Sequence, residues 1–135
     1  MTVWIAIGNT LRRDDGAAHR VLDLVGAVGG IRCHQLTPEM AELIAGADRV
    51  VFIDADLDPG PARLERLDEG AARGRSLAHF VEPAELVALA RQLFGFRGDA
   101  WLCRVPGEDF SDGSGLSPLA EANAAAAAGL LEDLK

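Results

Sequence analysis

Residues 2–16, TVWIAIGNTLRRDDG, join a short apolar run to a polar loop that contains two adjacent carboxylates. The continuous apolar run Thr2–Ile7, closed by Gly8, is typical of a strand buried on both faces. From Asp14 onward the apolar residues recur at helical spacing, and Gly29-Gly30 ends that pattern. The order strand, loop, helix predicts the first βα unit of an α/β fold.

The same alternation continues along the chain. Further strands are predicted at Ile31–Leu36, Arg49–Ala55 and Ala100–Val105, with a weaker edge strand at Ala62–Leu67. Helices are predicted to open at Pro38, Pro83 and Pro118, because proline suits the first helical position. We therefore expect residues 1–135 to form a single α/β domain. It should be a three-layer sandwich, with helices on both faces of a mostly parallel, twisted sheet of about five strands.

Acidic residues gather where the predicted strands end. In a common doubly wound strand order, strands one and three are neighbours, and ligands bind at the carboxyl ends of the strands beside that switch point. The acids that follow these ends are Asp14, Asp15, Asp54, Asp56, Glu108, Asp109 and Asp112. The sequence therefore predicts an acidic crevice at this edge of the sheet.

The first loop does not match a phosphate-binding loop. It has neither GxGxxG nor GK[ST], and two carboxylates stand where a phosphate would bind, which disfavours a nucleotide ligand. Asp14 or Asp15 could cap the first helix, but both cannot do so, which leaves one carboxylate free. Asp54 is either a turn residue or a functional carboxylate at the end of a central strand.

The three histidines have different predicted settings. We expect His19 on the partly exposed face of the first helix and His34 half-buried in the second strand. His79 precedes a helix near the same sheet edge as the acids. Two carboxylates and one imidazole suit a divalent transition metal such as nickel, iron or zinc. A His/Asp general-base pair acting on water is the alternative, and the pattern alone leaves both open.

Composition excludes several classes of function. The net charge of −8 disfavours nucleic-acid and membrane-surface binding. The only lysine is Lys135 and tyrosine is absent, so an internal catalytic lysine or tyrosine is excluded. Cys33 and Cys103 lie in apolar runs without a CxxC pattern, which favours buried structural roles. No apolar run approaches the roughly 20 residues of a membrane span and the N-terminus has no basic segment, so we expect a cytoplasmic location.

Four segments of the sequence, taken together, form a more specific family pattern than any one of them alone. They are IGNTLRRDDG (residues 7–16), RVVFIDA (49–55), a histidine shortly before a P-x-E-L helix, and FSDGSGLSP (110–118). In this order and spacing, over nearly the whole chain, they resemble the hydrogenase maturation endopeptidases. The resemblance implies an aspartyl-type hydrolase that removes a short C-terminal extension from the precursor of a nickel-containing hydrogenase large subunit.

By position, the resemblance implies that Asp15, Asp54 and His79 are both the metal contacts and the catalytic residues. Nickel would belong to the precursor, bind the protease transiently and orient the scissile peptide. The attacking nucleophile is not assigned. The implied partner is the precursor alone, with no nucleic acid and no membrane, and the protease is expected to be a monomer. The alternative is a non-proteolytic, nickel-dependent assembly or chaperone domain on the same fold.

Overall fold

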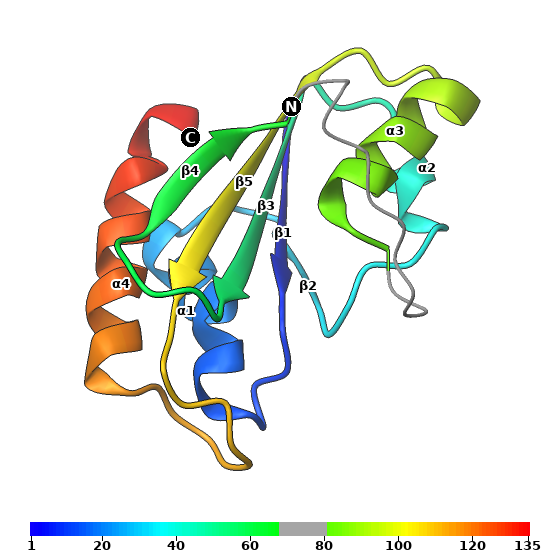
Figure 1. Ribbon diagram of the computed structural model, residues 1–135. Helices are drawn as coiled ribbons and strands as arrows, with labels where there is room; N and C mark the ends of the chain where they lie inside the picture. The colour runs from blue at the N-terminus through cyan, green and yellow to red at the C-terminus, as the bar shows by residue number, and fades with distance from the viewer. Residues whose placement is uncertain (68–80) are drawn as a thin grey trace.

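The computed structural model describes residues 1–67 and 81–135 (Figure 1). The strands are β1 (Thr2–Ile7), β2 (Ile31–Cys33), β3 (Arg49–Asp56), β4 (Arg63–Arg66) and β5 (Asp99–Pro106). The α-helices are α1 (Ala17–Val25), α2 (Met40–Ile44), α3 (Pro83–Phe94) and α4 (Pro118–Leu130). Two short 3-10 helices are η1 (Arg13–Gly16) and η3 (Glu132–Leu134).

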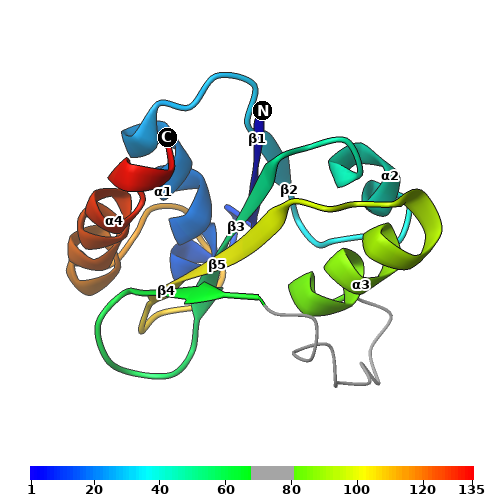
Figure 2. The ribbon, with the colours of Figure 1, turned by 90° about the horizontal axis from the view of Figure 1, so that it is seen from above.

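The five strands form one sheet in the order β2-β1-β3-β5-β4. All neighbours are parallel except β4, which pairs antiparallel with β5 at the edge. Figure 2 shows α1 and α4 on one face of the sheet and α2 and α3 on the other. The predicted three-layer α/β sandwich is confirmed, with β1 and β3 adjacent at the switch point.

Each face of the sheet carries its own apolar core, because successive strand residues point to opposite faces. From β3, Phe52 packs toward α2 and α3, while its neighbours Val51 and Ile53 pack toward α1 and α4. All three side chains are fully buried. Burial on both faces explains why the central strands appear in the sequence as continuous apolar runs rather than alternating ones.

Two predicted boundaries were wrong around β2. The strand ends at Cys33 instead of Leu36, because its partner β1 ends at Ile7 and the pair closes with Gly8 N donating to Cys33 O at 2.9 Å. The following helix begins at Met40 instead of Pro38, with Glu39 as its N-cap. Residues 34–39 therefore form a connecting segment that crosses the end of β1.

The first helix also begins differently from the prediction. Residues 13–16 form the 3-10 turn η1, and α1 starts only at Ala17. Neither Asp14 nor Asp15 caps a helix, because no side-chain cap hydrogen bond is made at the start of η1 or of α1. Both carboxylates are therefore available for other partners.

Asp14 joins the loop after β1 to the loop after β5. Its side chain is fully buried and accepts hydrogen bonds from the backbone N–H of Glu108 (2.8 Å), Asp109 (2.9 Å) and Ser117 (2.7 Å). Burial alone would raise the pKa of Asp14, but these bonds and that of the Ser117 hydroxyl outweigh it and lower the pKa. The two loops are thereby fixed to each other through one carboxylate.

Ser117 connects this network to α4. Its hydroxyl donates to Asp14 at 2.7 Å and accepts from Ala120 N at 3.1 Å, so it caps α4, which begins at Pro118 as predicted. Gly107 leaves the room that Asp14 needs, because a Cβ there would lie 2.6 Å from the Cβ of Asp14. The end of β5 and the start of α4 therefore pack directly on this carboxylate.

The substitution Asp14→Asn replaces one acceptor oxygen by an NH2 group that faces backbone donors. Buried donors left without an acceptor are costly, so we expect the free energy of unfolding to fall by about 3 kcal/mol in urea titrations. Asp112→Asn, on an exposed residue of the same loop, should change it by less than about 0.5 kcal/mol. Equal stability of the two variants would contradict the role given to Asp14.

Candidate functional site

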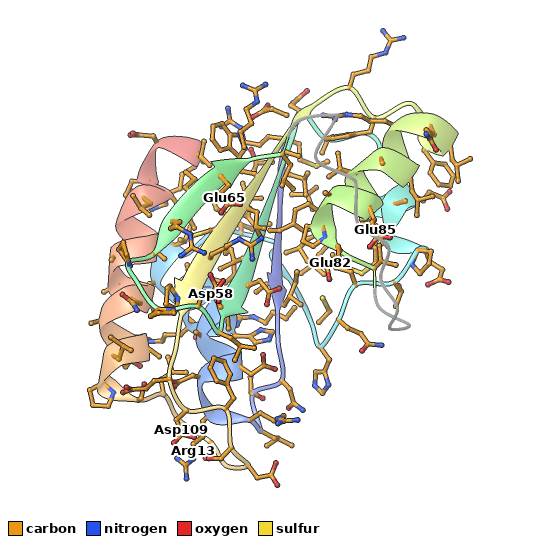
Figure 3. All side chains as sticks on the ribbon, viewed as in Figure 1. Arg13, Asp58, Glu65, Glu82, Glu85 and Asp109 are labelled. Atoms are coloured by element: carbon orange, nitrogen blue, oxygen red, sulfur yellow. The ribbon has the colours of Figure 1, made fainter. Side chains whose placement is uncertain are left out.

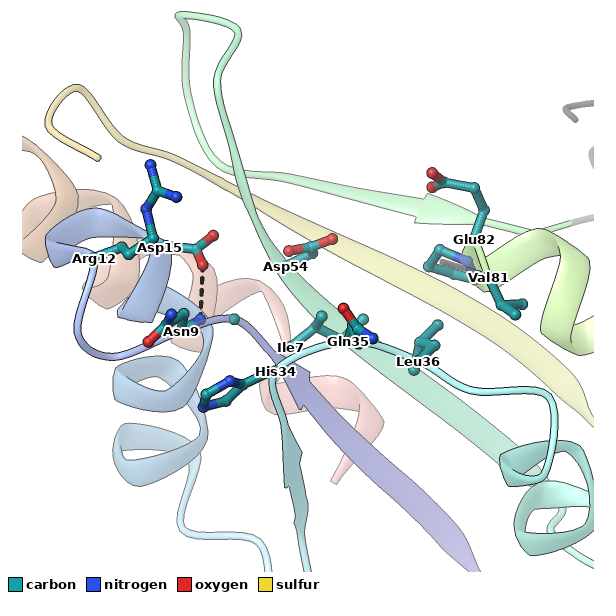
Figure 4. A pocket seen from close by; sticks show the side chains of 12 residues that line it. Ile7, Asn9, Arg12, Asp15, His34, Gln35, Leu36, Asp54, Val81 and Glu82 are labelled. Carbon is teal, nitrogen blue, oxygen red and sulfur yellow. Dashed lines mark hydrogen bonds between the residues drawn. The ribbon is translucent and has the colours of Figure 1, made fainter. Parts of the chain in front are cut away.

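A pocket of about 430 Å³ lies at the carboxyl ends of β1 and β3 (Figure 4). We call it the switch-point pocket. Its polar side chains come from four places, the loop after β1, the end of β3, the segment after β2 and the residue before α3. They are Asn9, Arg12, Asp15, Asp54, His34, Gln35 and Glu82. The position agrees with the rule that open α/β sheets bind ligands at the switch point.

Asp15 reaches the pocket because the chain folds back sharply after β1. Its Oδ2 accepts the backbone N–H of Asn9 at 2.7 Å, which holds the half-buried carboxylate against the end of the strand (Figure 4). Gly8 has a φ of +148°, and a Cβ there would lie 1.9 Å from the carbonyl oxygen of Asp15. Only glycine fits this approach, so the Gly-Asn pair of the first loop positions Asp15.

Asp54 faces the same space from the next strand. It is the partner of Ile7 in the parallel register of β1 and β3, and its side chain is half-buried. Burial raises the pKa of Asp54 to about 7, with the negative charges of Asp15 and Glu82 adding to the shift. Two carboxylates that face one pocket in this way can retain one proton near neutral pH or attract a divalent cation.

The acidic crevice is smaller than the sequence predicted. Of the seven acids expected there, only Asp15 and Asp54 line the switch-point pocket. Asp14 is buried in the network described above, and Asp56 pairs with Arg63 and accepts the backbone N–H of Asp58 at 3.1 Å. Asp109 accepts from the backbone and hydroxyl of Ser111 and lies near Arg13 (Figure 3). Glu108 and Asp112 are exposed on the same loop.

The histidines differ from their predicted settings. His79 lies outside the described residues. His19 is buried rather than partly exposed, because its ring packs under the first loop and its Nε2 lies 2.8 Å from Gly8 O. His34 is exposed at the pocket rim rather than half-buried, since β2 ends before it. Within residues 1–67 and 81–135, no group of three or more His, Cys, Asp or Glu side chains could hold a metal ion.

Glu82 and Arg12 are pocket residues that the sequence did not single out. Glu82 is the N-cap of α3, where it forms a capping box with Glu85 (Figure 3). The acid before Pro83 and the Glu three residues later carry that capping signal in the sequence. Arg12 had no comparable signal, because it is one of two adjacent arginines in a loop and only the fold decides which of them faces the pocket.

The cysteines are unsuited to nucleophilic chemistry. Burial raises the pKa of Cys33, with a further contribution from the charge of Asp54. Burial raises the pKa of Cys103 to about 12. Both thiols are therefore protonated at neutral pH, and the thiolate is the reactive form. Cys103 is fully buried and Cys33 is half-buried, close to the buried structural roles predicted for them.

Similarity to known proteins is found at the level of structure. No protein-family model matches the chain, and no curated protein matches it. The hydrogenase maturating endopeptidase HybD from E. coli superposes with a TM-score of 0.76 at 20% identity, covering 97% of this chain and 90% of that one. The chain has the fold of the hydrogenase maturation endopeptidases.

Other solved structures named as hydrogenase maturation proteases or peptidases are also similar to this chain. The [NiFe] hydrogenase maturation protease HycI from Thermococcus kodakarensis KOD1 has a TM-score of 0.72 at 19% identity, over 98% of this chain and 90% of that one. The hydrogenase 2 maturation peptidase from Thaumarchaeota archaeon SCGC_AB-539-E09 has a TM-score of 0.67 at 24% identity, over 99% and 98%. The fold implied by the sequence resemblance is therefore confirmed.

None of the helices in the described ranges has the length and apolar character to cross a bilayer.

The raised pKa of Asp54 predicts a pH-dependent stability. An ordinary Asp loses its proton near pH 3.8, whereas Asp54 in the folded chain keeps it to about pH 7. In this window the folded chain binds the extra proton, so the free energy of unfolding falls as pH rises. We expect Asp54→Asn to raise that free energy by about 2 kcal/mol near pH 8, since one pKa unit corresponds to about 1.4 kcal/mol. The gain should vanish near pH 4.

Asp56→Asn provides the matched contrast two residues away. Although burial opposes it, hydrogen bonds from Asp58 and Arg63 lower the pKa of Asp56, so its charged form stabilises the folded chain. That variant should be less stable than the parent near pH 8, measured by urea unfolding at both pH values. If Asp54→Asn raises the free energy of unfolding equally at both pH values, burial of the Asp54 charge is not the cause of the gain.

Proposed function

We propose that this chain is an endopeptidase that removes the C-terminal extension of the precursor of a nickel-containing hydrogenase large subunit. The observation that carries the proposal is the pairing of Asp15 and Asp54 in the switch-point pocket of a hydrogenase maturation endopeptidase fold. The printed names of the similar structures describe maturation proteases and peptidases. Three of the four segments that resemble this family lie on the loop after β1, on β3 and on the loop before α4.

Nickel carried by the precursor would be the recognition element. Burial raises the pKa of Asp54 and the like charge of Asp15 adds to that shift, so a divalent cation between the two carboxylates would offset both effects. Carboxylate oxygens with one imidazole are a ligand set that such a cation accepts. The resemblance makes His79 the third contact, although this residue lies outside the described ranges. An open pocket suits a metal that arrives and leaves with the substrate.

Carboxylates, rather than a serine or cysteine, are the groups available for the chemistry. Both thiols keep their protons at neutral pH, and no serine stands in a G-x-S-x-G context. Hydrolysis breaks the peptide C–N bond, adds the hydroxyl of water to the carbonyl carbon and delivers a proton to the leaving amine. A carboxylate of the pocket would carry that proton to the leaving amine. This assignment makes the enzyme aspartyl-type.

The partner, the oligomeric state and the location of the protein are part of the same proposal. The partner is the hydrogenase precursor, and the protein acts as a monomer in the cytoplasm. The net charge of −8 argues against nucleic acid or anionic membrane as further partners. A nickel-dependent assembly domain that binds the precursor without cutting it remains the competing function, and the experiment below separates the two.

The site variants Asp15→Asn, Asp54→Asn and His79→Ala are expected to lose precursor processing while remaining folded. Each removes a proposed contact to the precursor's nickel, so the rate should fall by at least about 100-fold. Processing is measured by mass spectrometry after incubation with nickel-loaded precursor, and folding by circular dichroism. Asp112→Asn, an exposed acid outside the pocket, is the matched control and should process normally.

The outcomes separate the candidate functions. Retained cleavage in all three site variants would overturn the residue assignment. Nickel-dependent association of the parent protein with the precursor, without shortening of the precursor, would favour the assembly domain instead.

A further inference from the structure

A second hollow, of about 320 Å³, shares Asp15 with the switch-point pocket. Its lining residues are Arg12, Asp15, Ala55, Leu57 and Phe110. We call it the Leu57 hollow. Arg12 and Asp15 line both cavities, so the two hollows adjoin along these residues. The proposed catalytic carboxylate Asp15 therefore lines two adjoining cavities.

The Leu57 hollow combines apolar walls with one cation. Leu57 follows β3 and is 76% exposed, so it contributes little to the core. Ala55 and Phe110 are half-buried beside it. An exposed leucine and an aromatic ring that line the same hollow offer a place for one apolar side chain of a ligand.

Arg12 differs from most other arginines of the described chain. Six of them form ion pairs with carboxylates, namely Arg13, Arg20, Arg32, Arg49, Arg63 and Arg104. Within residues 1–67 and 81–135, no carboxylate lies within 4.0 Å of the Arg12 guanidinium. Its Nε donates to Phe110 O at 3.3 Å, which leaves the two terminal nitrogens for another acceptor.

The backbone holds Arg12 in this place. Arg12 forms a parallel bridge with Gly113, and Arg13 N donates to Gly113 O at 3.1 Å. These contacts adjoin the Asp14 network that joins the same two loops. Figure 4 shows the Arg12 side chain beside Asp15, at the end of the switch-point pocket away from Glu82. An exposed guanidinium is thus presented from a fixed loop next to the proposed catalytic pair.

We propose that the Leu57 hollow binds the precursor segment adjacent to the scissile bond. One apolar side chain of that segment packs against Leu57 and Phe110, and a neighbouring acidic side chain pairs with Arg12. A peptide held through its metal at Asp15 and Asp54 must leave the pocket in two directions, and the two hollows adjoin at Asp15. Charge complementarity favours an acidic group, because the Arg12 guanidinium has no carboxylate partner among the described residues of a protein whose net charge is −8. The inference rests on the proposed function and adds its substrate specificity.

Two variants test the hollow without touching Asp15 or Asp54. Arg12→Gln removes the charge, and Leu57→Ser removes the apolar wall. Each should raise the KM for nickel-loaded precursor about tenfold and leave kcat within about twofold, because each removes binding rather than chemistry. Arg12→Lys should recover only part of the loss, since lysine keeps the charge but not the bidentate geometry.

Matched controls come from exposed residues elsewhere. Arg97→Gln removes a charge from an exposed arginine outside both hollows, and Val28→Ser removes an apolar side chain that is 98% exposed. Both should leave KM unchanged. On the substrate side, acidic residues flanking the cleaved bond are changed singly to the corresponding amide. One such change should weaken the binding of the precursor to the parent protein about tenfold. The same change should not weaken the binding of the precursor to the Arg12→Gln variant any further.

Dissociation constants for the nickel-loaded precursor are measured beside the kinetics. If the parent cleaves the precursor and both variants keep its KM, the specificity inference is overturned while the proposed function stands. If the substrate change and Arg12→Gln weaken binding additively, the proposed pairing of an acidic precursor residue with Arg12 is overturned. If the parent binds without cleaving, protease function fails, and tenfold weaker binding by both variants would still support the hollow. A parent protein that neither binds nor cleaves would overturn both proposals.

Discussion

One buried carboxylate holds the functional edge of this fold together. Asp14 accepts four hydrogen bonds from three residues that lie about a hundred positions later in the chain. These bonds join the loop after β1 to the loop after β5 and, through Ser117, to the start of α4. Burial of an ionised group is favourable only when its oxygens are fully hydrogen-bonded, which this arrangement achieves. The groups that line the pocket are positioned by loops that Asp14 fixes.

The adjacent acids Asp14 and Asp15 therefore divide two tasks. They lie in a 3-10 turn, where consecutive side chains point about 120° apart, so one faces the interior and the other faces the pocket. Asp14 has a lowered pKa because backbone donors surround it. Asp54, facing Asp15 across the pocket, has a raised pKa because it is buried beside like charge. A carboxylate with a lowered pKa and one with a raised pKa thus lie within one short stretch of sequence and its neighbouring strand.

The layer architecture and the switch point were predictable because burial on both faces leaves continuous apolar runs in the central strands. Asp15 and Asp54 could be placed at one edge from topology alone. The separate roles of Asp14, Asp56 and Asp109 could not, since their partners come from distant loops and from Arg63 on β4. The burial of His19 depends on the fold-back at Gly8, and the exposure of His34 depends on where β1 ends. Such details follow from tertiary contacts rather than local patterns.

Under the proposed function, the switch-point pocket binds a precursor that carries its own metal. The most direct measurement is the mass of a hydrogenase large-subunit precursor after incubation with the purified protein, with and without nickel loaded into the precursor. The account predicts that the nickel-loaded precursor is shortened at its C-terminus and that the nickel-free precursor keeps its mass. An unchanged mass of the nickel-loaded precursor, or equal cleavage of both forms, would contradict it.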